Sequence, residues 1–192
     1  MRNVSGSADR PGLGVDEIVD VLAGGARRTL GPGVGVTQLD HALQTAALLA
    51  HRHPGDDELA AAGLVHDVGH LLPGGSDETH ATDAADAVRW ALGERVAATV
   101  GLHVAAKRYL VATEGEYGGV LTADSVTSLR RQGGAMTEQE AAAFLDRPWA
   151  RDAVTLRRAD DSGKVQGLHV GDLEGWADVL RAVARRAGAD RG

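Results

Sequence analysis

The 192-residue chain contains no cysteine, so disulfide bonds and thiolate metal sites are excluded. A reduced, cytoplasmic environment is the location that this composition leads us to expect. Aromatic residues make up only 3% of the chain. Such a composition favours closely packed helices, and it offers few of the aromatic side chains that the strands of a β-sandwich favour.

Basic residues are also in the minority, with 20 Lys and Arg against 27 Asp and Glu and a net charge of −7. This balance argues against a nucleic-acid partner but allows a local basic pocket for a small anion. The chain shows no signal-peptide pattern, and no apolar run approaches the roughly 18 residues of a membrane span. We therefore expect no membrane partner.

The spacing of apolar residues predicts helices along most of the chain. The expected helices cover residues 15–30, 37–53, 58–72, 79–91, 94–110, 122–134, 137–146, 149–160 and 172–187. Thr137 and Glu140 have the spacing of a capping box. Residues 1–14 are expected to form a flexible tail and residues 15–192 a single domain with one core. The predicted fold class is an all-α bundle.

Seven of the eight histidines fall within predicted helices, and five of these are candidate site residues, namely His41, His66, His70, His80 and His103. The others, His51, His53 and His169, are interpreted as surface imidazoles. One histidine in an apolar helix would be interpreted as a satisfied core residue. Five of them beside an ionised Asp67 favour a metal site, because a buried carboxylate is costly unless it is paired or bound to a cation. Imidazole and carboxylate ligands suit iron, manganese or zinc.

The segment "LVHDVGH", residues 64–70, is central to this prediction. In a continuous helix, His66 and His70 share one face, and Asp67 is rotated by about 100° from His66. Asp67 therefore reaches a neighbouring position and can bridge two metal ions. His41 and His103 come from other helices, and Asp160 in "LRRADDSGK" is expected to close the site.

These segments resemble a known family. His41, the pair His66-Asp67, and Asp160 match the H…HD…D signature of the HD-domain superfamily, which is all-α and metal-dependent. The resemblance covers about residues 35–167. The segments "VTQLDHALQTA", "LVHDVGH", "DETH", "LHVAAKRYL", "SVTSLRRQGGAM" and "LRRADDSGKV" further resemble the HD-domain mixed-valence diiron oxygenases. That branch includes 2-amino-1-hydroxyethylphosphonate dioxygenase and related phosphonate oxygenases and is more distantly similar to myo-inositol oxygenase.

By position, the resemblance implies an HD-domain helical bundle with a central dinuclear site that holds two iron ions, Fe(II)/Fe(III), and uses O2. The implied iron ligands are His41, His66, Asp67 and Asp160 for one iron, with Asp67 bridging to a second iron held by His80 and His103. The implied substrate contacts are His70, Lys107, Ser125, Ser128 and Lys164. A spacing of four residues places Lys107 on the helix face of His103, and Lys164 on that of Asp160. Lysine binds phosphate-like groups as a point charge.

The resemblance also places a tyrosine and a glutamate, a pair that caps the iron and recognises the substrate amino group, where this chain has Gly31 and Val34. Neither of these side chains binds iron or an ammonium group. The expected substrate is therefore a small anionic 1-hydroxyphosphonate other than the usual aminophosphonate. It would be oxidised at C1 with O2, either with C–P cleavage or by hydroxylation alone.

Two alternatives remain open at this point. The first is a metal-dependent phosphohydrolase acting on a phosphate ester or nucleotide, the commoner activity of the superfamily. The second is a binding domain without activity. The sequence does not give the oligomeric state.

Overall fold

The computed structural model describes residues 12–31 and 35–189, and these residues are all-α apart from one isolated bridge between Thr29 and Thr37. The elements are α1 (Val15–Gly24), a 3-10 turn η1 (Gly25–Arg27), α2 (Gln38–Arg52), α3 (Asp57–Val65), a 3-10 turn η2 (Val68–Leu71), α4 (His80–Leu92), α5 (Glu94–Thr113), α6 (Tyr117–Val120), α7 (Ala123–Arg131), α8 (Glu138–Leu145), α9 (Ala150–Ser162) and α10 (Leu173–Ala189). The predicted all-α fold class is confirmed.

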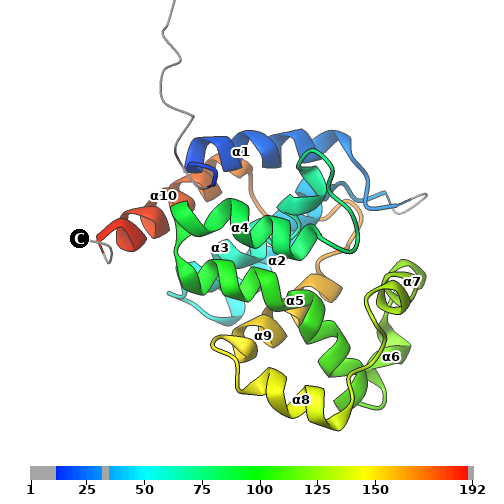
Figure 1. Ribbon diagram of the computed structural model, residues 1–192. Helices are drawn as coiled ribbons and strands as arrows, with labels where there is room; N and C mark the ends of the chain where they lie inside the picture. Colours follow the sequence, from blue (N-terminus) through cyan, green and yellow to red (C-terminus); the bar gives the residue numbers. More distant parts are fainter. Residues whose placement is uncertain (1–11, 32–34, 190–192) are drawn as a thin grey trace, which may run out of the picture.

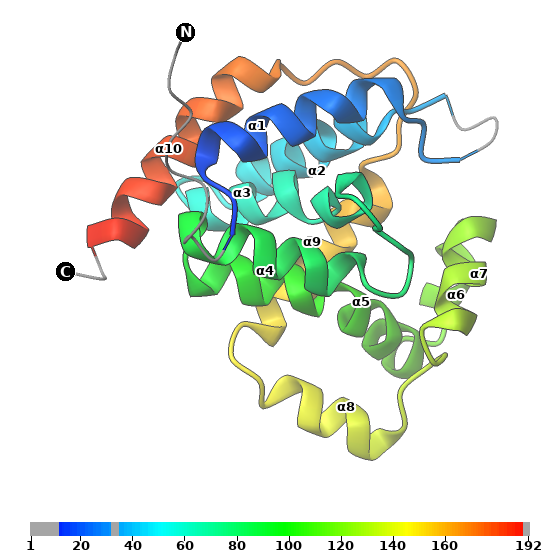
Figure 2. The ribbon, with the colours of Figure 1, turned by 45° about the horizontal axis from the view of Figure 1, so that its top comes forward.

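Helices α2, α3, α4, α5 and α9 form the centre of the molecule, and α5 packs against α3, α4 and α9. Figures 1 and 2 show α1 and α10 side by side at one end and α8 at the opposite end. The main apolar cluster joins residues of α1 to α5, η2, α9 and α10. A second, smaller cluster of Leu102, Phe144 and Ala153 with their neighbours lies between α5, α8 and α9, so the single predicted core has a satellite.

Local sequence explains several helix ends. Thr37 caps α2 through a capping box with Asp40. Thr137 and Glu140 form the predicted box at the start of α8, where the Thr137 hydroxyl accepts from the Glu140 N–H. Helix α7 ends before Gly133 and Gly134, whose φ angles of 97° and 71° suit glycine.

Three of the predicted helices end earlier than expected, including the one predicted over 122–134, which stops at Arg131. The helix predicted over 15–30 stops at Gly24, and η1 turns the chain toward α2. The helix predicted over 58–72 stops at Val65, and Asp67 leaves the helical path with φ −101° and ψ 8°. The prediction that His66 and His70 share a helix face is therefore wrong.

Close packing of η2 on α4 explains the break after Val65. A Cβ at Gly69 would lie 2.0 Å from the carbonyl oxygen of His80, so only glycine lets the two segments approach. The turn aims the side chain of Asp67 inward while Val68 remains buried.

The remaining differences lie outside the centre. Helix α6 was not predicted. Residues 1–11 of the predicted tail lie outside the described residues. The Leu13 N–H donates to the Ala87 carbonyl at 2.8 Å, and the Leu13 side chain packs against the main apolar cluster. None of the described helices has the length and apolar composition needed to cross a membrane.

Candidate metal centre

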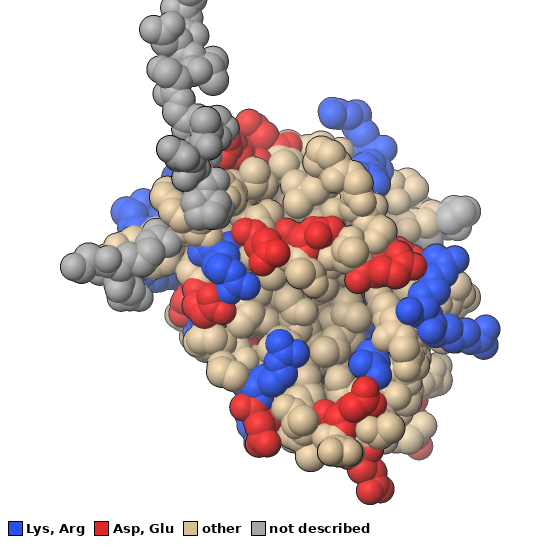
Figure 3. Space-filling model, in the orientation of Figure 1, with Lys and Arg blue, Asp and Glu red and all other residues tan. Residues whose placement is uncertain are grey.

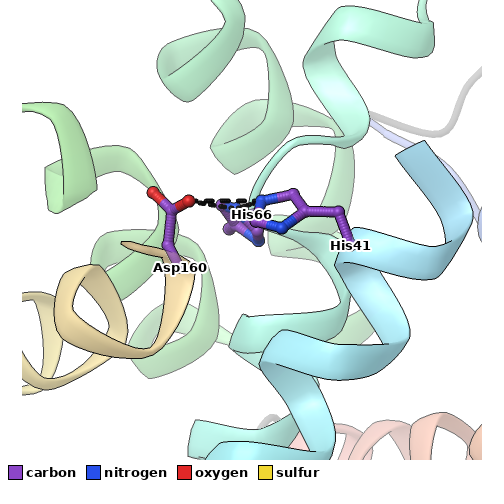
Figure 4. A group of neighbouring side chains, drawn as sticks. All are labelled: His41, His66 and Asp160. Atoms are coloured by element: carbon purple, nitrogen blue, oxygen red, sulfur yellow. Dashed lines mark hydrogen bonds and ion pairs between the residues drawn. The ribbon is translucent and has the colours of Figure 1, made fainter. Parts of the chain in front are cut away.

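Three buried side chains from three segments meet at the centre of the bundle. Figure 4 shows His41 of α2, His66 after α3 and Asp160 of α9 pointing toward one another. The Nε2 atom of His41 lies 3.2 Å from His66 Nε2 and 3.2 Å from Asp160 Oδ1. The His66 Nε2 atom lies 3.8 Å from the same carboxylate oxygen. These atoms form a compact three-ligand group.

A second pair of imidazoles faces the first group across Asp67. The Nε2 atoms of His80, at the start of α4, and His103, in α5, lie 3.1 Å apart. Each lies 3.7 Å from Oδ1 of Asp67. The other oxygen, Oδ2, lies 3.7 Å from His41 Nε2 and 3.6 Å from His66 Nε2. One carboxylate therefore has one oxygen directed to each pair of histidines, as a bridging ligand requires.

Backbone carbonyls orient all four imidazoles. The Nδ1 atoms of His41, His66, His80 and His103 face the carbonyl oxygens of Gly163, Gly63, Asp77 and Val100 at 2.7, 2.8, 2.9 and 2.7 Å. A carbonyl only accepts a hydrogen bond, so each Nδ1 carries a proton, and in the neutral ring each Nε2 then presents a lone pair. Two lone pairs directed at each other across 3.1–3.2 Å repel unless a cation lies between them.

The spacing of these atoms fits shared ions. Ligand atoms that lie about 2.1 Å from one ion are about 3.0–3.4 Å apart in octahedral or tetrahedral geometry. The closest pairs within the two groups lie 3.1 and 3.2 Å apart. The donor set of imidazoles and carboxylates suits iron, manganese or zinc. The residues present therefore fit a dinuclear metal site.

Protonation states agree with metal binding. Burial lowers the pKa of His66 and His80 and places that of His103 well below the ordinary imidazole value. Burial acts to raise the pKa of Asp67, but the nearby His66, His80 and His70 outweigh it, and the pKa falls below its usual range. These shifts in pKa favour neutral His66, His80 and His103 and an ionised Asp67, the forms that bind metal.

A buried ionic network holds Asp160. Burial acts to raise its pKa, but Arg157 and Lys164 outweigh this effect and keep the pKa well below the ordinary value. The Arg157 guanidinium, 4% exposed, donates to Oδ2 of Asp160, to Asp161 and to the Tyr117 hydroxyl. Lys164 Nζ lies 3.0 Å from Asp160 Oδ1. The prediction that Lys164 and Asp160 share a helix face is wrong, because α9 ends at Ser162. Lys164 contacts Asp160 from the segment that follows the helix.

Sequence reasoning gave no role to Arg157 or Tyr117. The spacing of Arg157 to Asp160 and Asp161 on one helix was a readable signal for an ion pair at i+3 and i+4. Tyr117 lies on the unpredicted helix α6, and no local pattern marks it.

A cavity of about 600 Å³ opens onto the metal groups. Its basic lining residues are Arg28, Lys107, Arg131, Arg157 and Lys164. Lys107 is 3% exposed, and its ammonium donates to the Ser128 hydroxyl at 2.8 Å. Burial, together with Arg157, lowers the pKa of Lys107 to about 8. Basic side chains gather over α7, which carries Arg130 and Arg131 in its last turn (Figure 3).

The other predicted substrate contacts also line this cavity. Ser125 and Ser128 of α7 do so, as does His70, whose ring stacks on His80 with centroids 4.0 Å apart. A ring nitrogen of His70 lies within 4.8 Å of ligand atoms of Asp67 and His80. Gly31 lines the cavity without a side chain, whereas Val34 lies outside the described residues. All eleven predicted site residues therefore gather at the metal groups or along the cavity.

Comparison with known proteins gives the family. No family model matches the chain. Hydroxymethylphosphonate dioxygenase of Gimesia maris is 41% identical over 148 residues, which span 72% of this chain and 73% of that protein. [1-Hydroxy-2-(trimethylamino)ethyl]phosphonate dioxygenase (glycine-betaine-forming) of Leisingera caerulea is 31% identical over 166 residues, which span 82% and 84%. The chain therefore belongs to the HD-domain phosphonate dioxygenases of the diiron type, the family that its motifs resemble.

Proposed function

We propose that the chain is a diiron dioxygenase that uses O2 to cleave the C–P bond of hydroxymethylphosphonate or a similarly small 1-hydroxyphosphonate. The observation that carries this proposal is Asp67, whose two oxygens face two separate pairs of histidines in a cavity lined by several basic side chains. The membership in a family of dioxygenases supports oxygen chemistry over the phosphohydrolase alternative.

The proposed ligands are His41, His66 and Asp160 for one iron, His80 and His103 for the other, and Asp67 between them. The two irons would supply O2 activation and a Lewis-acidic anchor for the substrate hydroxyl. The protein fixes the imidazoles through their Nδ1 bonds and fixes Asp160 through Arg157.

The substrate dianion would be held by cavity residues beside the metal groups. Lys107 and Lys164 supply charge, and Ser125 and Ser128 supply hydroxyl donors. The Lys107–Ser128 bond already joins α5 to α7, so a phosphonate oxygen between them replaces one polar partner with another. His70, stacked on His80, supplies a ring nitrogen beside the position of the substrate hydroxyl.

We propose a substrate without an amine because of the residues that line the cavity. Of the four carboxylates that line the cavity, Asp67 and Asp160 face the histidines and Asp77 pairs with Arg131. The fourth, Asp124, is exposed in the first turn of α7. Gly31 offers no side chain at the position where the resemblance expects an iron-capping tyrosine. The relative from Gimesia maris is named for a hydroxyphosphonate without an amine.

We further propose that residues 15–192 act as one domain.

The products follow from atom balance. Hydroxymethylphosphonate dianion and O2 together give one formate and one dihydrogen phosphate, with C1 oxidised to the carboxylate and O2 reduced. The test is to incubate the iron-loaded protein with hydroxymethylphosphonate and to quantify formate, phosphate and O2 consumption. Equal amounts of all three, and none without O2, support the proposal. Phosphate released equally well under argon contradicts it.

A further inference from the structure

The side chain of Gln44 holds a loop that carries two groups of the site. Gln44 lies on α2, one turn after His41, and is 1% exposed. Its Nε2 donates to the carbonyl oxygens of Val165 and Leu168 at 2.8 and 3.2 Å. Its Oε1 accepts from the Val165 N–H at 2.9 Å. The carboxamide thus uses both its donor and its acceptor groups on one short stretch of backbone.

That stretch, residues 163–168, delivers the two groups to the metal centre. The Gly163 carbonyl accepts from His41 Nδ1 at 2.7 Å. The Lys164 ammonium lies 3.0 Å from Asp160 Oδ1. A Cβ at Gly163 would lie only 2.6 Å from Thr45 Oγ1, so the loop approaches α2 as closely as glycine permits.

Apolar burial anchors the described loop weakly at this point, and Val170 just beyond it packs against the main apolar cluster. The side chains of Val165 and Leu168 are 50% and 46% exposed. Helix α9 has ended at Ser162, and α10 begins only at Leu173. The Gly163 N–H still bonds to the Ala159 and Asp160 carbonyls at the end of α9, and the Leu168 N–H donates to the Val165 carbonyl at 3.3 Å. Beyond Gly163, the Gln44 bonds to the Val165 and Leu168 backbone tie the loop to α2.

We propose that Gln44 is a positioning residue of the enzyme: it fixes the 163–168 loop so that Lys164 binds the substrate dianion and Gly163 orients His41. This inference rests on the proposed function, because it assigns Lys164 to an anionic substrate. Gln44 itself lines neither the cavity nor the metal groups, so its effect passes through the loop.

The experiment compares Gln44→Met with the wild type. Methionine keeps a similar volume but has no comparable donor or acceptor. Two quantities are measured on the iron-loaded protein: amide hydrogen exchange of the 163–168 segment, and the Kd of hydroxymethylphosphonate under argon. We expect faster exchange of that segment and a Kd raised by about tenfold, the factor that a lost charge-assisted contact typically gives.

Three controls separate positioning from general destabilisation. Leu49→Val alters the buried face of the same helix and should leave exchange of 163–168 and the Kd unchanged. Gln44→Glu keeps the acceptor for Val165 N–H but places a buried oxygen opposite the Val165 and Leu168 carbonyls, so it should also speed exchange of 163–168. In a Lys164→Met background, Gln44→Met should weaken phosphonate binding much less than it does alone.

The outcomes distinguish the role of Gln44 from the proposed function of the protein. Unchanged exchange of 163–168 in both Gln44 variants overturns the role of Gln44. An equal loss of affinity in the Lys164→Met background also overturns it, because the effect would not pass through Lys164. Failure of the wild-type protein to bind the phosphonate counts against the proposed function, while the exchange measurement still tests whether Gln44 holds the loop.

Discussion

Replacing Arg157 with methionine tests how much of the metal centre depends on its ionic support. The guanidinium is almost fully buried and binds Asp160 and Asp161 together with the Tyr117 hydroxyl. Removing one partner of a buried ion pair costs about 3–5 kcal/mol, because a charge is left without compensation. Each kcal/mol lowers the Tm of a domain of this size by about 2–4 °C. The expected fall in Tm of the iron-free protein is therefore about 6–20 °C.

The same variant should also bind iron more weakly, because Asp160 loses the contact that fixes its free oxygen. Loss of such outer contacts typically costs about 10–100-fold in metal affinity. The assay combines thermal unfolding with and without iron and competition against a chelator of known affinity.

Arg95→Met is the matched control for this experiment. Arg95 pairs with Asp56, Glu58 and Asp152, but its side chain is 28% exposed and none of these residues belongs to the metal groups. It should lose about 1 kcal/mol or less per exposed pair and keep its iron affinity. An Arg157→Met protein with wild-type Tm and wild-type iron affinity would refute the reasoning.

Three further predictions follow from the site. His41→Ala and His103→Ala each remove a ligand of one group only, so elemental analysis should find about one iron fewer per chain in either variant; two irons in both would contradict the ligand assignment. The Lys107 pKa of about 8 means that its positive charge is present below this pH and lost above it. The kcat/KM for the phosphonate should therefore fall above about pH 8, and Lys107→Met should lower kcat/KM and abolish this alkaline limb. Gly163→Ala places a Cβ 2.6 Å from Thr45 Oγ1. It should displace the Gly163 carbonyl from His41 and weaken iron binding about 10–100-fold in the chelator competition.

Much of the helical framework was predictable because its signals are local. Apolar periodicity and the capping residues Thr137 and Glu140 are set by residues three or four apart in the chain. The break after Val65 was not predictable in this way. No proline stands between Val65 and Asp67, and the break depends on how closely Gly69 approaches the His80 carbonyl.

The site was predictable to a different extent. Spacing and the resemblance together named His41, His66, Asp67, His80, His103 and Asp160, and the structure brings their ligand atoms together. Asp67 does not reach the second group of histidines by helical rotation, as predicted, because it lies in a turn. The turn nevertheless presents both carboxylate oxygens to the histidines. The supporting contacts of Gln44 and Tyr117 join residues 40 or more positions apart, which no local pattern records.

The most direct test of the dinuclear site is electron paramagnetic resonance on the protein loaded with iron, together with elemental analysis. A coupled Fe(II)/Fe(III) signal from about two irons per chain, shifted by hydroxymethylphosphonate and lost in Asp67→Asn, is the expected result. A signal from isolated mononuclear iron that is unchanged by the phosphonate and by Asp67→Asn would contradict it.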